Sequence, residues 1–179
     1  MLIRAFRDDD GAAVRALITA AFGDPKVAEL SDALRARSDP GATLIADEDG
    51  EVVGMVQLST SWIDAPRALV PVLVLSPLAV RPDAQRRGIG RRLLAAATHG
   101  AVELESPLLF LEGDPAYYSR LGWVRASEHG FTPPSVRIPD AAFQLVLLPR
   151  HEVWMTGALV YNETFWRLDC VGLRDTPQR

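Results

Sequence analysis

Residues 73–94, LVLSPLAVRPDAQRRGIGRRLL, decide how this sequence of 179 residues folds. A predicted apolar strand is followed by a turn and then by a helix, and the first turn of this helix contains Gly88 and Gly90. Four arginines surround this helix start, namely Arg86, Arg87, Arg91 and Arg92. A helix N-terminus carries partial positive charge, so cations are unfavourable there unless an anion is bound. Glycines would let the oxygens of such an anion approach the free backbone N–H groups. The stretch therefore predicts a phosphate or pyrophosphate site.

The same stretch lies inside a predicted strand–helix–strand unit. Residues 69–80 form an almost unbroken apolar run, which is typical of a strand buried on both faces. A helix is predicted from 88 to about 101, and a second strand from 107 to 111. Two strands joined in this way are expected to be parallel, with a right-handed crossover. Pro77 has no N–H to complete a ladder, so we expect a bulge or a divergence from a neighbouring strand near it.

The rest of the chain alternates between helical and extended patterns. A short strand at 2–6 precedes two helices, which the turn at 23–25 separates. Residues 43–46 and 51–62 flank Asp47-Glu48-Asp49-Gly50, a strong hairpin signal. A short helix at 116–121 and a strand at 143–148 follow. We predict one α/β domain with a mixed sheet over residues 1–148, and a C-terminal extension over 149–179 that packs on the same domain.

Composition excludes several classes of protein. The chain is 48% apolar and 23% charged, with a net charge of −4. A nucleic-acid binder would usually show an extended basic face, so no nucleic-acid partner is expected. No apolar run approaches the roughly 20 residues that cross a membrane, and the N-terminus lacks the pattern of a signal peptide. The single cysteine, Cys170, fits a reducing compartment. We expect a cytoplasmic protein without a membrane partner.

Other phosphate-binding and metal-binding motifs fit the sequence poorly. A Rossmann turn would place a third glycine at position 93, where this chain has Leu93. A Walker loop would end in Gly-Lys-Ser/Thr, a tripeptide that the sequence lacks. The three histidines have no metal-ligand spacing, and no metal is expected.

The sequence does resemble one family, the GCN5-related N-acetyltransferases (GNAT). QRRGIG at 85–90 is similar to the family's Gln/Arg-x-x-Gly-x-Gly/Ala signature, and it follows a typical lead-in, LAVRP at 78–82. YYSRLGW at 117–123 resembles the family's Phe-Tyr-x-x-Leu-Gly-Phe segment. The run GDPAYY at 113–118 is similar to a bacterial branch of small predicted acetyltransferases. The resemblance implies the GNAT fold, a mixed and mostly antiparallel central sheet with a parallel βαβ unit at the cofactor cleft.

The resemblance also implies acetyl-CoA as cosubstrate. Its pyrophosphate would bind the backbone N–H groups of six consecutive residues, Arg86, Arg87, Gly88, Ile89, Gly90 and Arg91. The backbone of Leu78, Ala79 and Val80 would pair with the pantetheine arm, and an N–H near Leu78 would stabilise the oxyanion. Tyr118 falls on the general-acid position of the family, four residues before Gly122.

The proton acceptor and the acceptor substrate are less defined. Glu112 is the best-placed base by sequence, although an ordinary loop carboxylate is the alternative reading. Asp24, Glu29 and Asp32 would give the acceptor side an acidic lip. The predicted activity is acetyl transfer to a primary amine of an unidentified small molecule or peptide. A non-catalytic acyl-CoA-binding or regulatory module is the alternative, and the C-terminal extension leaves room for a homodimer.

Overall fold

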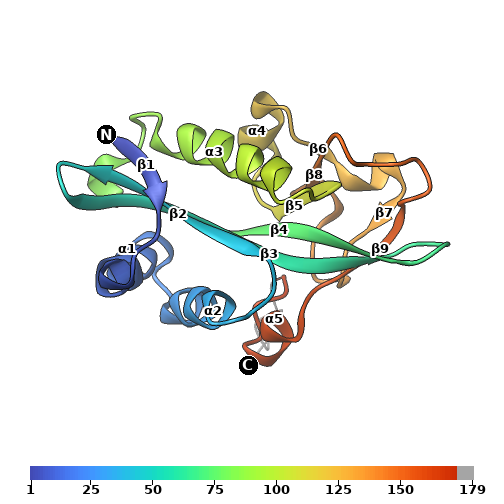
Figure 1. The fold of residues 1–179 in the computed structure, drawn as a ribbon, viewed down its shortest axis with the longest axis horizontal. Coiled ribbons are helices and arrows are strands. Elements are labelled where there is room, and N and C mark those ends of the chain that lie inside the picture. Colours follow the sequence, from blue (N-terminus) through green and yellow to red (C-terminus); the bar gives the residue numbers. More distant parts are fainter. Residues whose placement is uncertain (173–179) are drawn as a thin grey trace, which may run out of the picture.

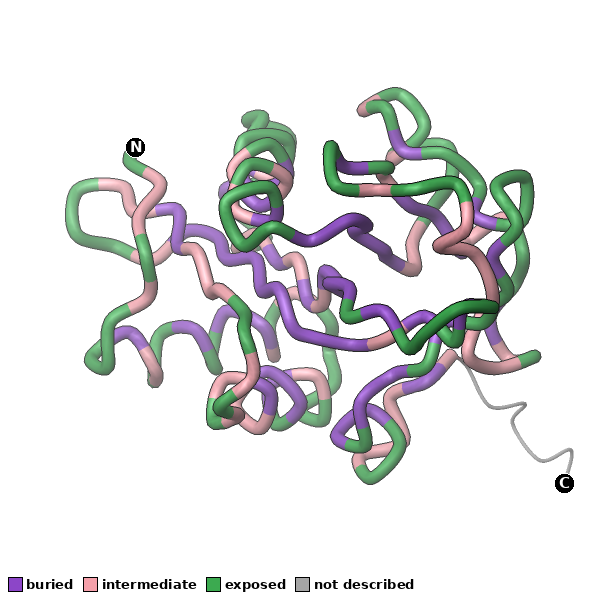
Figure 2. Tube along the Cα trace, turned by 45° about the vertical axis from the view of Figure 1, so that its right-hand side comes forward, coloured by how far each residue is buried: buried purple, intermediate pink, exposed green. Residues whose placement is uncertain are grey.

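Two long antiparallel strands form the middle of the protein, β3 (Glu51–Asp64) and β4 (Leu69–Val80) (Figure 1). The computed structural model describes residues 1–172. The residues of both strands are mostly buried, as the apolar runs predict, and Figure 2 shows this buried centre with exposed turns around it.

Seven further strands complete the sheet within the described residues. The order is β1 (Leu2–Ala5), β2 (Gly41–Glu48), β3, β4, β5 (Leu108–Glu112), β8 (Phe143–Leu147) and β6 (Val124–Arg125). In addition, β9 (Gly157–Val160) pairs with β3 and with β7 (Phe131–Thr132). Only β4–β5 and β7–β9 are parallel in this part of the chain. The predicted mixed and mostly antiparallel sheet is therefore confirmed, including the parallel pair around the central helix.

Helices cover both faces of the sheet (Figure 1). One face carries α1 (Gly11–Phe22), α2 (Pro25–Arg35) and α5 (Glu163–Arg167), and the other carries α3 (Ile89–Glu103) and α4 (Pro115–Tyr118). Among the described residues, 3₁₀ turns lie at Asp8–Asp10, Pro82–Ala84, Ser119–Leu121, Ala126–His129 and Asp140–Ala142. No helix among residues 1–172 is both long enough and apolar enough to cross a bilayer.

The helix α3 is held on the sheet by one apolar stripe. Its buried residues recur at steps of three and four along the helix: Ile89, Leu93, Leu94, Ala97 and Ala101. At Gly54 of β3, an added Cβ would lie 3.0 Å from the Leu93 side chain, so a larger residue there would push the helix away. This packing fixes where the helix N-terminus points.

The strands β4 and β5 separate soon after they meet. They pair only at Leu73–Leu109 and Val74–Phe110. On its other side, β4 shifts register against β3 opposite Pro77, between the Val56 and Leu58 positions. The divergence predicted from Pro77 is confirmed. The side of β4 that faces β5 is left without a neighbouring strand at positions 75–80 of the described structure.

The C-terminal segment joins the sheet rather than only covering it. Strand β2 pairs with β3 as far as Ser59, and β9 takes over the same side of β3 at Trp62–Asp64. The buried Asn162 follows β9 and anchors it, because its amide donates a hydrogen bond of 2.8 Å to the Thr60 carbonyl. Its side-chain oxygen caps α5. Residues 157–162 are thus tied firmly to the middle of the fold.

Candidate active site

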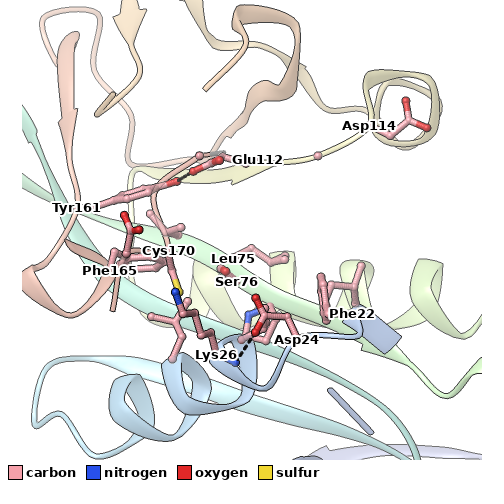
Figure 3. A pocket seen from close by; sticks show the side chains of 18 of the residues that line it. Phe22, Asp24, Lys26, Leu75, Ser76, Glu112, Asp114, Tyr161, Phe165 and Cys170 are labelled. Atoms are coloured by element: carbon pink, nitrogen blue, oxygen red, sulfur yellow. Dashed lines mark hydrogen bonds between the residues drawn. The ribbon is translucent and has the colours of Figure 1, made fainter. Parts of the chain in front are cut away.

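A cavity of about 860 Å³ lies where β4 and β5 separate. Its floor includes Leu75, Ser76 and Pro77, and Figure 3 shows side chains from several other elements around it. Three of the predicted site residues line this cavity, namely Leu78, Glu112 and Tyr118. The folding of the chain therefore brings the end of β4, the end of β5 and the short helix α4 to one place.

The start of α3 leaves a row of backbone donors free. Gly88 caps the helix in the left-handed conformation (φ +80°), and Arg86 is also left-handed (φ +62°). The first N–H groups of any helix lack partners inside the helix. Within residues 1–172, none of the N–H groups of residues 86–91 donates to a protein acceptor. This arrangement is the backbone geometry that an anion requires.

The four arginines around this start divide into two pairs. Arg87 forms an ion pair with Glu48 at 2.7 Å, and Arg92 donates to the Met1 carbonyl at 3.3 Å. Arg86 and Arg91 are exposed, and neither makes an ion pair with a residue of the described chain. Only Arg86 and Arg91 are thus available to an incoming anion without breaking a contact, a distinction that the sequence pattern does not reveal.

Tyr117 lies next to the helix start. A Cβ added at Gly90 would come within 3.0 Å of the Tyr117 hydroxyl, so the two groups are close neighbours. Burial raises the pKa of Tyr117, and the charge of Arg91 works against this rise. Tyr117 therefore lies between the cavity and the start of α3.

Tyr118 points to a different part of the cavity, although it is the next residue. Its ring lies against the backbone of Gly113 and makes edge contacts with Trp123 and Tyr117, at centroid distances of 6.0 and 4.9 Å. Burial is the main cause that raises the pKa of Tyr118 to about 12. Among the described residues its hydroxyl has no hydrogen-bond partner. At neutral pH this hydroxyl is therefore protonated.

Glu112, the last residue of β5, forms a pair that the sequence did not predict. The Tyr161 hydroxyl donates a hydrogen bond of 2.6 Å to Glu112 Oε1 (Figure 3). Burial raises the pKa of Glu112, while this hydrogen bond, the charge of Arg137 and the Gly172 backbone lower it. Tyr161 is itself buried, with 4% of its surface exposed. Glu112 is therefore a hydrogen-bonded member of the cavity wall rather than a loop carboxylate.

The cavity wall carries both apolar and charged side chains. The apolar ones include Phe22, Val27, Leu30 and Phe165, and the charged ones include Asp114 and Asp169. Asp24 and Lys26 also line it, and Asp24 accepts a hydrogen bond from the Lys26 backbone at 2.9 Å.

The predicted acidic lip is wrong for two of its three residues. Glu29 and Asp32 do not line the cavity, and Asp32 pairs with Arg15 of α1 and with Arg35 on the next turn of its own helix, α2. Within residues 1–172, no three metal-binding side chains come together.

Comparison with known proteins extends these observations. Residues 2–126 match the family model described as an acetyltransferase (GNAT) domain. The uncharacterized N-acetyltransferase YhbS of Escherichia coli K12 is 30% identical over 171 residues, covering 93% of this chain and 99% of the relative. A second relative from this strain, the uncharacterized N-acetyltransferase YjhQ, is 26% identical over 153 residues and covers 83% and 84% of the two chains.

Two solved structures are similar over nearly the whole chain. The crystal structure of YhbS from Escherichia coli in complex with CoA has a TM-score of 0.81 and 28% identity, covering 93% of this chain and 92% of that one. A GNAT family acetyltransferase from Brucella melitensis in complex with acetyl-CoA has a TM-score of 0.74 and 28% identity, with 92% and 97% covered.

Proposed function

The chain belongs to the GNAT acetyltransferase family, and from this premise we propose that it moves an acetyl group from acetyl-CoA to a primary amine of a small molecule or peptide. One observation carries the proposal. The cavity is lined by the Tyr118 side chain and the partly buried Glu112 carboxylate at an unpaired strand edge, and Tyr117 connects it to the open N-terminus of α3. The family places the acyl carrier at such an edge, so both side chains would lie near the reacting atoms.

The residues at the start of α3 fit acetyl-CoA. The free N–H groups of Arg86, Arg87, Gly88, Ile89, Gly90 and Arg91 would hold its pyrophosphate, as a helix N-terminus holds other anions. The side chains of Arg86 and Arg91 would add charge. The unpaired side of Leu78, Ala79 and Val80 would accept the pantetheine arm like an added strand. The CoA and acetyl-CoA complexes of the two similar proteins support this assignment.

Glu112 and Tyr118 would carry out the two proton transfers of the reaction, one from the amine nitrogen and one to the sulfur of CoA. An amine is mostly protonated at neutral pH, and its nitrogen must lose a proton to attack. In the proposal, the ammonium loses this first proton to water before it attacks. Glu112 then takes the second proton from the nitrogen as the C–N bond forms and the C–S bond breaks. Tyr118 gives its phenolic proton to the departing sulfur, so the products are an amide and CoA in its thiol form. Both side chains then return to their starting protonation by exchange with water.

The cavity wall favours one kind of acceptor. The apolar side chains of Phe22, Val27, Leu30 and Phe165 would surround the body of the amine, and Glu112 would meet its charged nitrogen. The hydroxyls of an aminoglycoside would face these apolar side chains, which is unfavourable, whereas a second cationic group could meet Asp24, Asp114 or Asp169. We therefore propose an amine with an aliphatic or aromatic body.

Two measurements test the proposal. CoA should raise the melting temperature of the protein by mass action. Thiol release from acetyl-CoA should then be followed with benzylamine, tryptamine, spermidine, kanamycin and a short peptide with a free N-terminus. Release that is fastest with benzylamine or tryptamine is the expected result. A CoA-dependent rise in melting temperature without thiol release from any amine would instead indicate a non-catalytic acyl-CoA-binding module.

A further inference from the structure

Tyr161 contributes to the site from a part of the chain that neither sequence motif contains. It lies outside residues 2–126, the range matched by the family model. Even so, its hydroxyl is 2.6 Å from Glu112 Oε1, across a sequence separation of 49 residues. A contact of this length between a phenol and a carboxylate is a strong, charge-assisted hydrogen bond.

Three contacts hold the Tyr161 side chain in place. On one side, β9 pairs with β3 through Val160 opposite Trp62. On the other, the Asn162 amide donates to the Thr60 carbonyl at 2.8 Å. The Tyr161 ring stacks on Phe165, with a centroid distance of 4.5 Å and an interplanar angle of 28°. With its backbone fixed on both sides and its ring stacked, Tyr161 has little freedom to turn away from Glu112.

The hydrogen bond engages Oε1, one of the two carboxylate oxygens of Glu112, and the Gly172 backbone also stabilises the ionised carboxylate. Burial and the neighbouring carboxylate raise the pKa of Tyr161 well above that of an ordinary tyrosine, so it is a proton donor at neutral pH. Arg137 also faces Glu112, and it is itself paired with Asp169 at 3.1 Å. Tyr118, Asp114 and Lys26 line the same cavity.

We infer that Tyr161 is a positioning residue, which fixes Glu112 Oε1 and thereby turns Oε2 toward the acceptor amine. This inference rests on the proposed function, in which Glu112 accepts the proton of the amine. A carboxylate fixed at one oxygen cannot rotate freely, so its second oxygen keeps one direction relative to the cavity. The C-terminal segment would then be part of the catalytic apparatus, even though its residues do not touch the reacting atoms.

The test compares three variants with the wild-type protein. Tyr161→Phe removes the hydroxyl and keeps the ring stack. Phe165→Leu removes the stack and keeps the hydroxyl, so it controls for lost packing. Glu112→Gln removes the proton acceptor and identifies the carboxyl signal of Glu112 in ¹³C NMR spectra of protein labelled at the glutamate side-chain carboxyl.

The titration of the Glu112 carboxyl should depend mainly on the Tyr161 hydroxyl. In Tyr161→Phe the Glu112 signal is expected to titrate about one pH unit higher, because a hydrogen bond that favours the ionised form is lost. Phe165→Leu should melt at a lower temperature, and its titration midpoint should move less than that of Tyr161→Phe, because the hydroxyl is kept. A Tyr161→Phe midpoint equal to that of the wild-type protein overturns the inference, whether or not the protein turns over any amine.

Kinetics provide the second readout, with whichever of the five amines named above gives the fastest thiol release. In Tyr161→Phe, kcat should fall about tenfold, and the acidic limb of kcat/KM should move to higher pH with the titration midpoint. KM for acetyl-CoA should stay within about twofold. Full activity in Glu112→Gln would overturn the inference and leave acetyl transfer intact. Absence of turnover with every amine would remove the proposed function, and with it the catalytic role of Tyr161.

Discussion

The position of the Tyr118 ring can be tested without altering Tyr118 itself. Gly113 follows β5, and the ring lies directly on its backbone. A Cβ built at Gly113 would be 2.2 Å from Tyr118 Cε2 and 2.8 Å from Cδ2. Carbon atoms in contact prefer roughly 3.5–4.0 Å, so Gly113→Ala must push the ring away by about 1 Å or more. The ring has little room to move, because Trp123 and Tyr117 contact it from other sides.

This displacement should affect activity more than stability. Overpacking of this kind costs about 1–3 kcal/mol, which a domain of this size tolerates with a lower melting temperature. A catalytic group that is misplaced by about 1 Å loses about 100-fold in rate. We therefore expect kcat of Gly113→Ala to fall about 100-fold in the thiol-release assay. The CoA-dependent rise in melting temperature should persist, since the start of α3 is unchanged.

The matched control is Gly11→Ala at the start of α1. A Cβ at Gly11 meets nothing within 4 Å, so this change alters a glycine without displacing a neighbour. It should leave kcat unchanged and stabilise the protein slightly, by about 0.4–1 kcal/mol. A Gly113→Ala enzyme with wild-type kcat would refute the reasoning, because the Tyr118 hydroxyl would then not need its present position.

Three other outcomes are expected. Tyr118→Phe should lower kcat by about 10²–10⁴-fold, measured by thiol release, with the CoA-dependent rise in melting temperature preserved. Arg91→Glu should weaken CoA binding by about tenfold at low salt and less at high salt, whereas Arg92→Glu, at a side chain already engaged with the Met1 carbonyl, should weaken it less. The hydrogen bonds from Arg4 lower the pKa of Asp10, so this carboxylate stabilises the folded state above its ordinary pKa of 3.8, and the contribution is lost as pH falls through the lowered value. Asp10→Asn should reduce the loss of stability in acid, measured by urea unfolding between about pH 2 and pH 5.

Each of these outcomes has a contradicting result. If Tyr117→Phe rather than Tyr118→Phe lowers kcat, the acid is the neighbouring tyrosine. Equal effects of Arg91→Glu and Arg92→Glu on CoA binding would mean that only the net charge of the helix start matters. An Asp10→Asn protein with unchanged acid sensitivity would show that its hydrogen bonds with Arg4 contribute little to the pH dependence of folding.

Much of the fold could be predicted because its signals are local. The apolar run at 69–80 indicates a buried strand, whatever its neighbours in the sheet. The segment Asp47–Gly50 indicates a tight turn between two adjacent strands. Pro77 removes one donor from the ladder, so a disturbance there follows from its chemistry alone. The strand β9 has only four residues, and its place on β3 depends on a pairing between distant segments. No local pattern encodes such a pairing.

The site also has parts that the local sequence predicts and parts that it does not. The glycines at the start of α3 and the tyrosine of α4 lie in short motifs, so their residue types and spacing can be read from the sequence. The hydrogen bond between Glu112 and Tyr161 joins two elements that are far apart in the chain. Of the four arginines, Arg87 forms the ion pair with Glu48 because its side chain points in that direction at the surface. The sequence shows a cluster of four arginines but does not indicate which of them forms this pair. Prediction fails where function depends on a contact rather than on a residue type.

The pairing of β9 with the end of β3 can form only late during translation. Asp64 of β3 emerges from the ribosome almost a hundred residues before its partner Ala158. At about 5–20 residues per second, this segment of β3 waits roughly 5 to 20 seconds for the strand that covers it. The start of α3 and the strands beside it are complete well before Tyr161 arrives. A nascent chain can thus form the end of the site proposed to bind the acyl donor while the acceptor end is still open. The uncovered edge of β3 is the part that a chaperone would need to protect.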